Sequence, residues 1–365
     1  LALELPHIDP AGVAAAALPL GGLPALTGAL GRAYDWAGVS DLLLSLDRYP
    51  HVLIAAMSGG GKSTLLRSFV LSLAACNSPA GLALVLLDGK NENGDTIGAL
   101  PHTVGAAWSA SGQVDLLRQV GALLDDRIAH PGQGAGGRVL VVVDELLSLV
   151  DAGGGDLLAR IMTIGRSLGV HVCAASQYVT AAAVGGIVKA NFTARLVGRV
   201  SSAPAALAAA GIGDTGAEKL AGRGAFLAVT GDRIMRFQAY NVTAGAAAGI
   251  VGQVAGRWPG VSPVALPSAV SGQASGSAAA SVVGSSGVVA NDEIARIARV
   301  LAPVAGGVAD GSVSLAAAIR LAYGGAASTG GSYRRRVLLA LDQLSKTGPH
   351  NVHGQTVGAF SVVWW

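Results

Sequence analysis

The sequence predicts an α/β protein with a mostly parallel sheet, followed by a small, mainly helical second domain. Between residues 51 and 245, short apolar runs rich in β-branched residues alternate with stretches of helical periodicity. This is the pattern of a parallel sheet covered on both faces. From about residue 256 the chain becomes rich in Gly, Ser, Ala and Val and almost free of charge, until helical periodicity returns near residue 291. We therefore expect a first domain over residues 1–255, a flexible linker over 256–290 and a second domain over 291–365.

The composition favours a close-packed interior of small residues over a membrane protein. Hydrophobic residues make up 51% of the 365 residues but aromatic residues only 4%, because alanine carries much of the excess. The longest uncharged windows, about 10–31 and 258–291, are broken by proline and glycine, and no signal peptide opens the chain. Cys76 and Cys173 lack metal-type spacing, so a reduced, cytoplasmic protein is expected. The chain starts at Leu1 rather than Met, which leaves room for an upstream domain or a membrane anchor outside it.

Six apolar runs are predicted to form the strands of the first domain. They are "HVLIAA" (51–56), "LALVLLD" (82–88), "RVLVVVDE" (138–145), "VHVCAAS" (170–176), "ARLVGRV" (194–200) and "AFLAV" (225–229). An amphipathic helix is expected over residues 113–129, with one apolar face formed by Val114, Leu117, Val120, Leu124 and Ile128.

The stretch "HVLIAAMSGGGKST" (51–64) predicts a phosphate-binding loop between the first of these strands and a helix that starts near Lys62. Glycines let backbone N–H groups turn toward phosphate oxygens, and the helix N-terminus adds a favourable dipole. Lys62 would reach the β- and γ-phosphates of ATP, and the Ser63 hydroxyl would bind Mg²⁺. Ala56 departs from the motif, which has glycine at its first position; a glycine turn without a ligand is the alternative. The predicted nucleotide-binding residues are Ser58, Gly59, Gly60, Gly61, Lys62, Ser63 and Thr64.

Two acidic residues follow a buried run at "RVLVVVDELLSLV" (138–150). Asp144 is predicted to hold Mg²⁺, directly or through water, and Glu145 to orient and deprotonate the attacking water. A simple cap of a strand-to-helix turn is the alternative.

The net charge of +3 and pI near 9.0 permit a nucleic-acid partner without requiring one.

Other chemistries have weaker support in the sequence. "GIGDTG" (211–216) fits a dinucleotide fingerprint only formally, because an alanine-rich helix precedes it instead of a strand. His350 and His353 have the spacing to chelate a metal, but a solvated tail explains them better.

Six stretches in order along the chain resemble FtsK/SpoIIIE-type DNA translocases. They are "YPHVLIAAMSGGGKST", "LVLLDGK", "VLVVVDELLSL", "IGRSLGVHVCAASQ", "NFTARLVGRVSS" and "GDTGAEKLAGRGAFL". The resemblance covers roughly residues 15–242, and "GAEKLAGRG" (216–224) is its most specific part. It implies a RecA-like P-loop NTPase fold and a hexameric ring motor that pumps double-stranded DNA with ATP.

The same resemblance implies roles for three further residues. Gln177 would sense the γ-phosphate, and Arg166 would act as an arginine finger in the neighbouring subunit. Arg195 is the other finger candidate, and an ordinary surface charge is the alternative for Arg166. The ending "SQYVT" replaces the usual threonine-glutamine-arginine-proline, which leaves the substrate contacts open.

The C-terminal segment predicts three short amphipathic helices, in "NDEIARIARVLAP", "SLAAAIRLAYGG" and "GGSYRRRVLLALDQL". They resemble a winged-helix DNA-binding domain, with the tail from Lys346 supplying wing strands and Arg334, Arg335 and Arg336 opening the recognition helix. A helical protein-interaction domain is the alternative.

These observations predict ATP-driven translocation of double-stranded DNA by a homo-oligomer, most naturally a hexamer. A conjugative DNA-transfer or protein-export ATPase of the same family is the first alternative. A nucleotide-switched DNA-binding adaptor is the second, although an adaptor has no need of the catalytic base Glu145.

Overall fold

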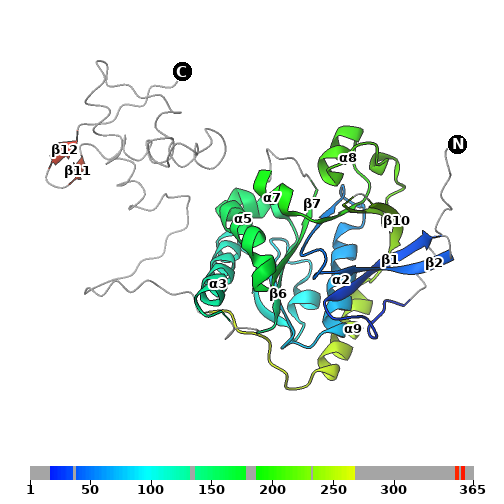
Figure 1. Ribbon diagram of the computed structural model, residues 1–365, viewed down its shortest axis with the longest axis horizontal. Helices are drawn as coiled ribbons and strands as arrows, with labels where there is room; N and C mark the ends of the chain where they lie inside the picture. Colours follow the sequence, from blue (N-terminus) through cyan, green and yellow to red (C-terminus); the bar gives the residue numbers. More distant parts are fainter. Residues whose placement is uncertain are drawn as a thin grey trace, which may run out of the picture. The chain divides into compact units, whose positions relative to one another are not determined.

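The first part of the chain folds around one large sheet. The computed structural model describes residues 17–35, 38–131, 136–177, 186–231, 233–267, 350–352 and 355–357. The chain divides into two units, Leu1–Gln273 and Ala274–Trp365. In the first unit a ten-stranded sheet is covered by helices on both faces (Figure 1).

Six neighbouring strands of this sheet run parallel and form its main part, which confirms the predicted fold class. Each of the six predicted strands is present, and the parallel set contains five of them together with β5. In spatial order the parallel strands are β8 (Ala194–Val197), β3 (His51–Ala55), β7 (Val170–Ser176), β6 (Arg138–Val143), β4 (Leu82–Leu87) and β5 (Thr103–Ala107).

Four antiparallel strands extend the sheet beyond β8. The sixth predicted strand is β9 (Ala225–Thr230), which pairs antiparallel with β8. Beyond it lie β10 (Arg233–Ala239), β1 (Thr27–Asp35) and the edge strand β2 (Gly38–Ser45). These last three strands were not predicted from the sequence.

The glycines of β1 explain why the sequence does not show it as a strand. A Cβ at Gly28 would lie 2.7 Å from the Phe69 ring, and one at Gly31 would lie 2.1 Å from the carbonyl oxygen of Gln238. Side chains are excluded at both positions because a helix and the β10 backbone approach β1 closely. Close packing therefore requires glycine at positions where β-branched residues would have indicated a strand.

The helices are divided between the two faces of the sheet (Figure 1). α2 (Lys62–Cys76) and α9 (Ala244–Arg257) contribute to the apolar core on one face. The other face is covered by α3 (Ala110–Ala129), α4 (Leu146–Leu149), α5 (Gly155–Ile164), α7 (Gly186–Asn191) and α8 (Ala203–Ala210).

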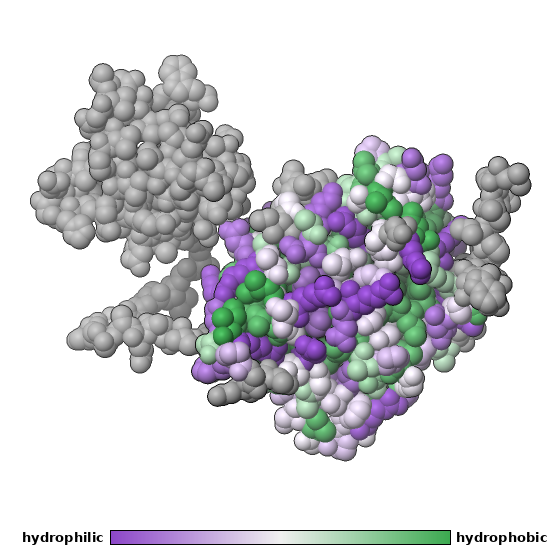
Figure 2. Space-filling model, in the orientation of Figure 1, coloured by the Kyte–Doolittle hydropathy of each residue, from purple (hydrophilic) through white to green (hydrophobic). Residues whose placement is uncertain are grey.

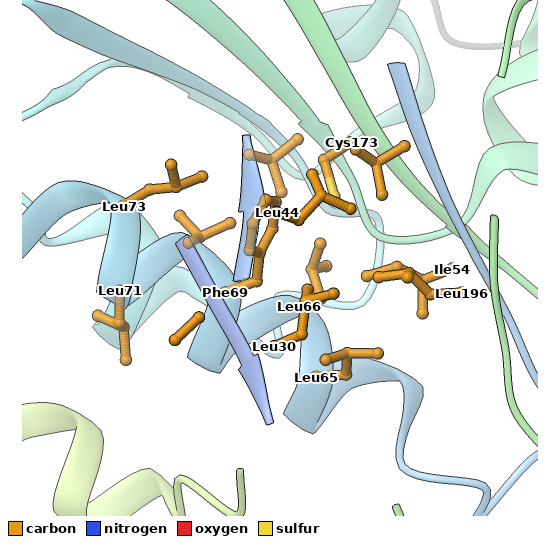
Figure 3. Close-up of a cluster of buried hydrophobic side chains, with 14 of the residues drawn as sticks. Leu30, Leu44, Ile54, Leu65, Leu66, Phe69, Leu71, Leu73, Cys173 and Leu196 are labelled. Carbon is orange, nitrogen blue, oxygen red and sulfur yellow. The ribbon is translucent and has the colours of Figure 1, made fainter. Parts of the chain in front are cut away.

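Side chains of β3 alternate between these two cores. Leu53 and Ala55 face the core with α3 and α5, whereas Ile54 faces the core with α2. Figure 3 shows the α2 side, where Phe69 packs among side chains from several strands, including Leu30 and Leu44. Phe69 is fully buried, and burying such a side chain is worth about 1.5–3 kcal/mol. The strand that leads to the phosphate loop is thus held from both sides.

The predicted helix over 113–129 is confirmed as α3, but one residue of its apolar face is misplaced. Ile128 is 53% exposed, so it does not belong to the buried face. Arg127 takes the inward position of this last turn and donates hydrogen bonds to the carbonyl oxygens of Leu168 and Gly137. A buried cation that satisfies backbone acceptors has displaced the apolar residue.

The predicted linker begins too early at residue 256. α9 continues to Arg257, whose guanidinium donates to the carbonyl oxygens of Leu20 and Ala75. Val264 and Leu266 pack against the core on the α3 face. Residues 256–267 therefore belong to the first unit.

In the second unit the structure describes only an antiparallel pair, β11 (His350–Val352) and β12 (Gln355–Val357). This pair falls in the tail predicted to supply wing strands. The three predicted helices, with Arg334, Arg335 and Arg336, lie outside the described residues, as does the rest of the predicted linker. Among the residues that the structure describes, no helix has the length and apolar character needed to cross a membrane.

Candidate active site

The predicted phosphate loop connects the end of β3 to the start of α2, at the carboxyl edge of the parallel strands. Gly59 and Gly61 adopt positive φ angles of 75° and 97°, which favour glycine. Gly61 is the N-cap of α2, and Lys62 is its first residue and 7% exposed. The loop therefore turns sharply at two glycines and presents a helix N-terminus, as an anion-binding loop requires.

The alanine at the first position of the motif fits because its neighbours have no side chains. Ala56 is fully buried. A Cβ at Gly60 or at Gly198 would lie 2.9 Å from the Ala56 methyl group. The methyl group occupies this space, so the departure from the motif leaves the glycine turn intact.

A second turn, formed by Gly222, Arg223 and Gly224, supports the phosphate loop from the antiparallel side of the sheet. Its three residues have φ angles of 77°, 51° and 87°. The Gly224 N–H donates to the carbonyl oxygen of Gly60 at 3.2 Å, and a Cβ on Gly61 would meet the backbone of Gly224 at 3.0 Å. The side chain of Gln238 in β10 donates to the carbonyl oxygen of Arg223 at 2.8 Å.

This 222–224 turn ends the stretch "GAEKLAGRG", which gave the most specific resemblance. The sequence offered no reason for that specificity. The structure supplies one, because the turn needs glycine both for its own backbone and for close contact with the phosphate loop. Gln238 was missed because a single glutamine in an unpredicted strand carries no signal.

Asp144 follows β6 and is 1% exposed. Its N–H donates to the carbonyl oxygen of Leu87 in β4, which fixes the residue at the end of the strand. Burial raises the pKa of the Asp144 carboxyl to about 6, although the positive charge of Lys62 opposes the shift. Among the residues that the structure describes, neither carboxylate oxygen has a hydrogen-bond partner.

A buried carboxylate with both oxygens unpartnered is costly unless a cation satisfies it. Carboxylate oxygens beside a phosphate site are typical ligands of Mg²⁺. Asp144, with the Ser63 hydroxyl at the start of α2, therefore fits the predicted metal-binding role. Among the described residues, no cluster of three or more His, Cys, Asp or Glu side chains forms an all-protein metal site.

The structure brings Gln177 and Glu145 together. The Gln177 amide donates to Glu145 Oε2 at 3.3 Å, and the Ser176 hydroxyl donates to Oε1 at 3.3 Å. The Lys90 ammonium lies 3.9 Å from Oε2. Both oxygens of the predicted base are thus oriented by the ends of neighbouring strands, a position from which a carboxylate can act on a water molecule.

Lys90 and Asp88 were not predicted as site residues, although both occur in the quoted stretch "LVLLDGK". Asp88 is fully buried and accepts hydrogen bonds from the N–H groups of Lys90 (3.0 Å) and Asn93 (2.8 Å). It also accepts one from the Asn93 side-chain amide at 3.1 Å. The acid after β4 therefore shapes a turn, and the turn directs the lysine toward Glu145.

Arg166 lies far from the phosphate loop of its own chain. It is exposed in the short 3-10 helix Gly165–Leu168, which precedes β7. Burial lowers the pKa of His51, the first residue of β3, to about 4, and the nearby charge of Arg166 contributes. Arg166 therefore lies at the amino edge of the sheet, and the five residues of β3, roughly 16 Å of strand, separate it from the loop.

Arg195, the other finger candidate, is engaged within its own chain. Its guanidinium donates to the carbonyl oxygens of Lys189 at 2.8 Å and Ala209 at 3.3 Å. It thereby connects β8 with α7 and α8. Such a residue is less available to a neighbouring subunit than the exposed Arg166.

Part of the chain is similar to a known protein family. Residues 29–130, which contain the phosphate loop and the Lys90 turn, match the model of the FtsK/SpoIIIE family. The chain contains a P-loop ATPase domain, and over this stretch it is similar to the FtsK/SpoIIIE family. DNA translocase FtsK of Helicobacter pylori strain J99 is 31% identical over 225 residues, covering 55% of this chain and 26% of that protein. The chain thus spans only about a quarter of the length of this curated relative.

Solved structures support the fold of this domain. The cytoplasmic domain of the Type VII secretion ATPase EccC of Thermomonospora curvata superposes with a TM-score of 0.56 and 24% identity, covering 72% of this chain and 34% of that one. ATPases 2 and 3 of EssC from Geobacillus thermodenitrificans give a TM-score of 0.61 with 17% identity, covering 72% and 55%. At these identities the similarity establishes the P-loop ATPase fold alone.

Two substitutions separate nucleotide binding from hydrolysis at this site. Lys62→Ala should abolish ATP binding or turnover, because the other positive charge near Asp144, on Lys90, lies beside Glu145. Glu145→Gln should retain binding but lose turnover, since an amide cannot accept the proton of water. Titration with a fluorescent ATP analogue and a steady-state ATPase assay would measure both. Wild-type turnover in Glu145→Gln would exclude Glu145 as the base.

Proposed function

We propose that the protein hydrolyses ATP in order to move along double-stranded DNA. The observation that carries this proposal is the position of Glu145, which is oriented by Gln177 and Ser176 beside Asp144 and the phosphate loop. A domain that only binds nucleotide does not need an oriented carboxylate at this place. The names of its sequence relatives, DNA translocase FtsK, support DNA as the substrate of movement.

In this proposal the phosphates of ATP lie in the loop over Ser58–Thr64, with Lys62 at the β- and γ-phosphates. Ser63 and Asp144 hold Mg²⁺, which when bound neutralises charge on the phosphates. Glu145 accepts a proton from the attacking water. The Gln177 amide keeps the Glu145 carboxylate in place, and in this proposal it also responds to the γ-phosphate.

We further propose that the active form is a ring of identical subunits, most naturally a hexamer. Arg166 supports this, because an exposed arginine at the opposite edge of the sheet cannot reach the phosphate loop of its own chain but is available to a neighbour. Met57, within the phosphate loop, is 42% exposed, and Leu207 on α8 is 51% exposed. Figure 2 shows apolar surface over α8, as expected where a neighbouring subunit covers the domain.

A second DNA contact is proposed for the C-terminal region. Arg334, Arg335 and Arg336 form its densest positive cluster in the sequence. In helix-turn-helix domains the start of the recognition helix meets bases and phosphates. We propose that these arginines bind DNA while the ATPase domain follows the backbone without regard to sequence.

Protein export is the competing function within the same fold. The secretion ATPases EccC and EssC are structural neighbours of this chain, but their identity of 24% or less carries no functional weight against the DNA translocases. An assay with DNA decides between the two functions.

The first test is the ATPase rate of the full chain with and without a long, mixed-sequence DNA duplex. Strong stimulation is expected, because a translocase should hydrolyse ATP faster while it is bound to DNA. Glu145→Gln serves as the inactive control. Turnover that is indifferent to DNA would favour export, and binding of ATP without any turnover would favour a nucleotide-switched adaptor.

The second test asks whether Arg166 works in trans. Arg166→Ala and Glu145→Gln subunits should each be inactive, yet their mixture should regain part of the turnover, because some interfaces then hold both groups. An arginine finger contributes about 10³ to 10⁵ in rate in other phosphoryl-transfer enzymes. The absence of rescue, with turnover independent of protein concentration, would assign catalysis to a single subunit.

The third test concerns the C-terminal arginines. Replacing Arg334, Arg335 and Arg336 with alanine in the full chain should weaken DNA binding and reduce its salt dependence, since each lost phosphate contact removes roughly 0.9 from the logarithmic slope. Fluorescence anisotropy over a range of salt concentrations measures both. An unchanged slope would contradict a role of the three arginines in DNA binding.

A further inference from the structure

The contact between Lys90 and Glu145 has no part in the function proposed so far. Lys90 comes from the turn after β4, whereas the two neutral donors on Glu145, Ser176 and Gln177, come from the end of β7. The carboxylate is thus held from two sides, by hydrogen bonds from one strand end and by a charge from another. The charged partner is the one with access to solvent, since the Lys90 side chain is 47% exposed and that of Glu145 15%.

The turn that carries Lys90 is buried at its two ends and exposed between them. Asp88 and Asn93 are fully buried and hydrogen-bonded to each other, while Lys90, Asn91 and Glu92 between them are exposed. The Lys90 backbone is therefore held in place by Asp88, and only its side chain is free to change partner. A lysine side chain on a rigid turn can exchange one anion for another at little structural cost.

Two lysines act on Asp144 at this edge of the sheet, and of these Lys62 is buried whereas Lys90 is exposed. In the sequence between Arg67 and Arg118, Lys90 is the only lysine or arginine. His102 in that interval is buried, and burial lowers its pKa, so it is neutral near pH 7. Trp108, at the end of the neighbouring strand β5, is 40% exposed, and its indole would lie 3.4 Å from a Cβ on Gly94.

An exposed lysine after β4 and an exposed aromatic residue after the neighbouring strand β5 are residue types that occur in nucleic-acid-binding surfaces, where lysine contacts the phosphates. Glu92 and Asp95 are exposed nearby, so the turn is not a general basic patch. A phosphate that approaches the exposed part of this turn would meet the Lys90 ammonium, and binding it would draw Lys90 away from Glu145.

We propose that Lys90 is a positioning residue that holds the Glu145 carboxylate while no DNA is bound, and that a DNA phosphate competes for the Lys90 ammonium and releases Glu145 for catalysis. This inference rests on the proposed function, because it requires Glu145 as the base and DNA as the activating partner. It assigns the link between DNA and ATP hydrolysis to one side chain.

Three substitutions test the proposal in the full chain. Lys90→Ala removes the charge, Lys90→Arg keeps it, and Lys219→Ala removes an exposed lysine from the short 3-10 helix Ala217–Lys219 as a matched control. ATPase kcat and KM are measured for each variant with and without a long DNA duplex, and thermal unfolding checks that the variants are folded.

Lys90→Ala should raise the DNA-free kcat roughly two- to fivefold, the range that a partly exposed ion pair supports. Its stimulation by DNA should shrink by the same factor, with little change in KM for ATP. Lys90→Arg and Lys219→Ala should both behave like the wild type. This pattern distinguishes control of Glu145 from a general loss of surface charge.

The proposal is overturned if Lys90→Ala has the same DNA-free kcat and the same stimulation as Lys219→Ala. It is also overturned if Lys90→Ala loses turnover in both conditions and Lys90→Arg restores it, because Lys90 would then serve the chemical step itself. Failure of the proposed function looks different. In that case the wild type does not respond to DNA, while a raised DNA-free kcat in Lys90→Ala would still support the hold of Lys90 on Glu145.

Discussion

The parallel pairing of β4, β6, β7 and β3 brings every group of the site to one edge of the sheet, and the rest of the structure depends on that register. Ala55 pairs with Ser176, and Leu87 pairs with Val143, so the strands end side by side. The phosphate loop, Gln177, Asp144 with Glu145, and the Lys90 turn each follow directly after one of these strands. A shift of one residue in any pairing would turn the attached side chains to the opposite face. The two cores that pack against the sheet prevent such a shift.

Small residues allow the loops around the phosphate site to approach one another closely. Ala56, Gly60 and Gly198 meet at distances that admit no further methyl group, and Gly224 lies against Gly61 in the same way. The abundance of alanine and glycine in the composition thus has a local counterpart at the site. Close backbone contact connects the phosphate loop through the 222–224 turn to Gln238, and hence to the antiparallel half of the sheet. The antiparallel strands therefore support the site as well as enlarging the domain.

The site places charges where their solvation is poorest. Asp144 and Lys62 are both buried, and burial keeps the pKa of the Asp144 carboxyl near 6, above the ordinary range of an aspartate. Groups in this state interact strongly with charged ligands, because little water screens them. Glu145 differs, since polar and charged side chains already surround its carboxylate. Asp144 is thus prepared to receive a cation, whereas the Glu145 carboxylate already has partners within its own chain.

The sequence by itself indicated five of the six parallel strands, the phosphate loop and the acidic pair. Continuous apolar strands and the spacing of "SGGGKST" and "VVVDE" are local patterns whose physical meaning does not depend on distant residues. Only the tertiary structure decided what meets across strands. It showed Gln177 and Lys90 on Glu145, the 222–224 turn against the phosphate loop, and Arg166 at the opposite edge. It also showed β1, in which Phe69 and the β10 backbone lie too close to Gly28 and Gly31 for any side chain there. In α3, the buried position of the last turn belongs to Arg127 and not to Ile128. These features arise from contacts between segments far apart in the chain, and no periodicity or motif within one segment records them.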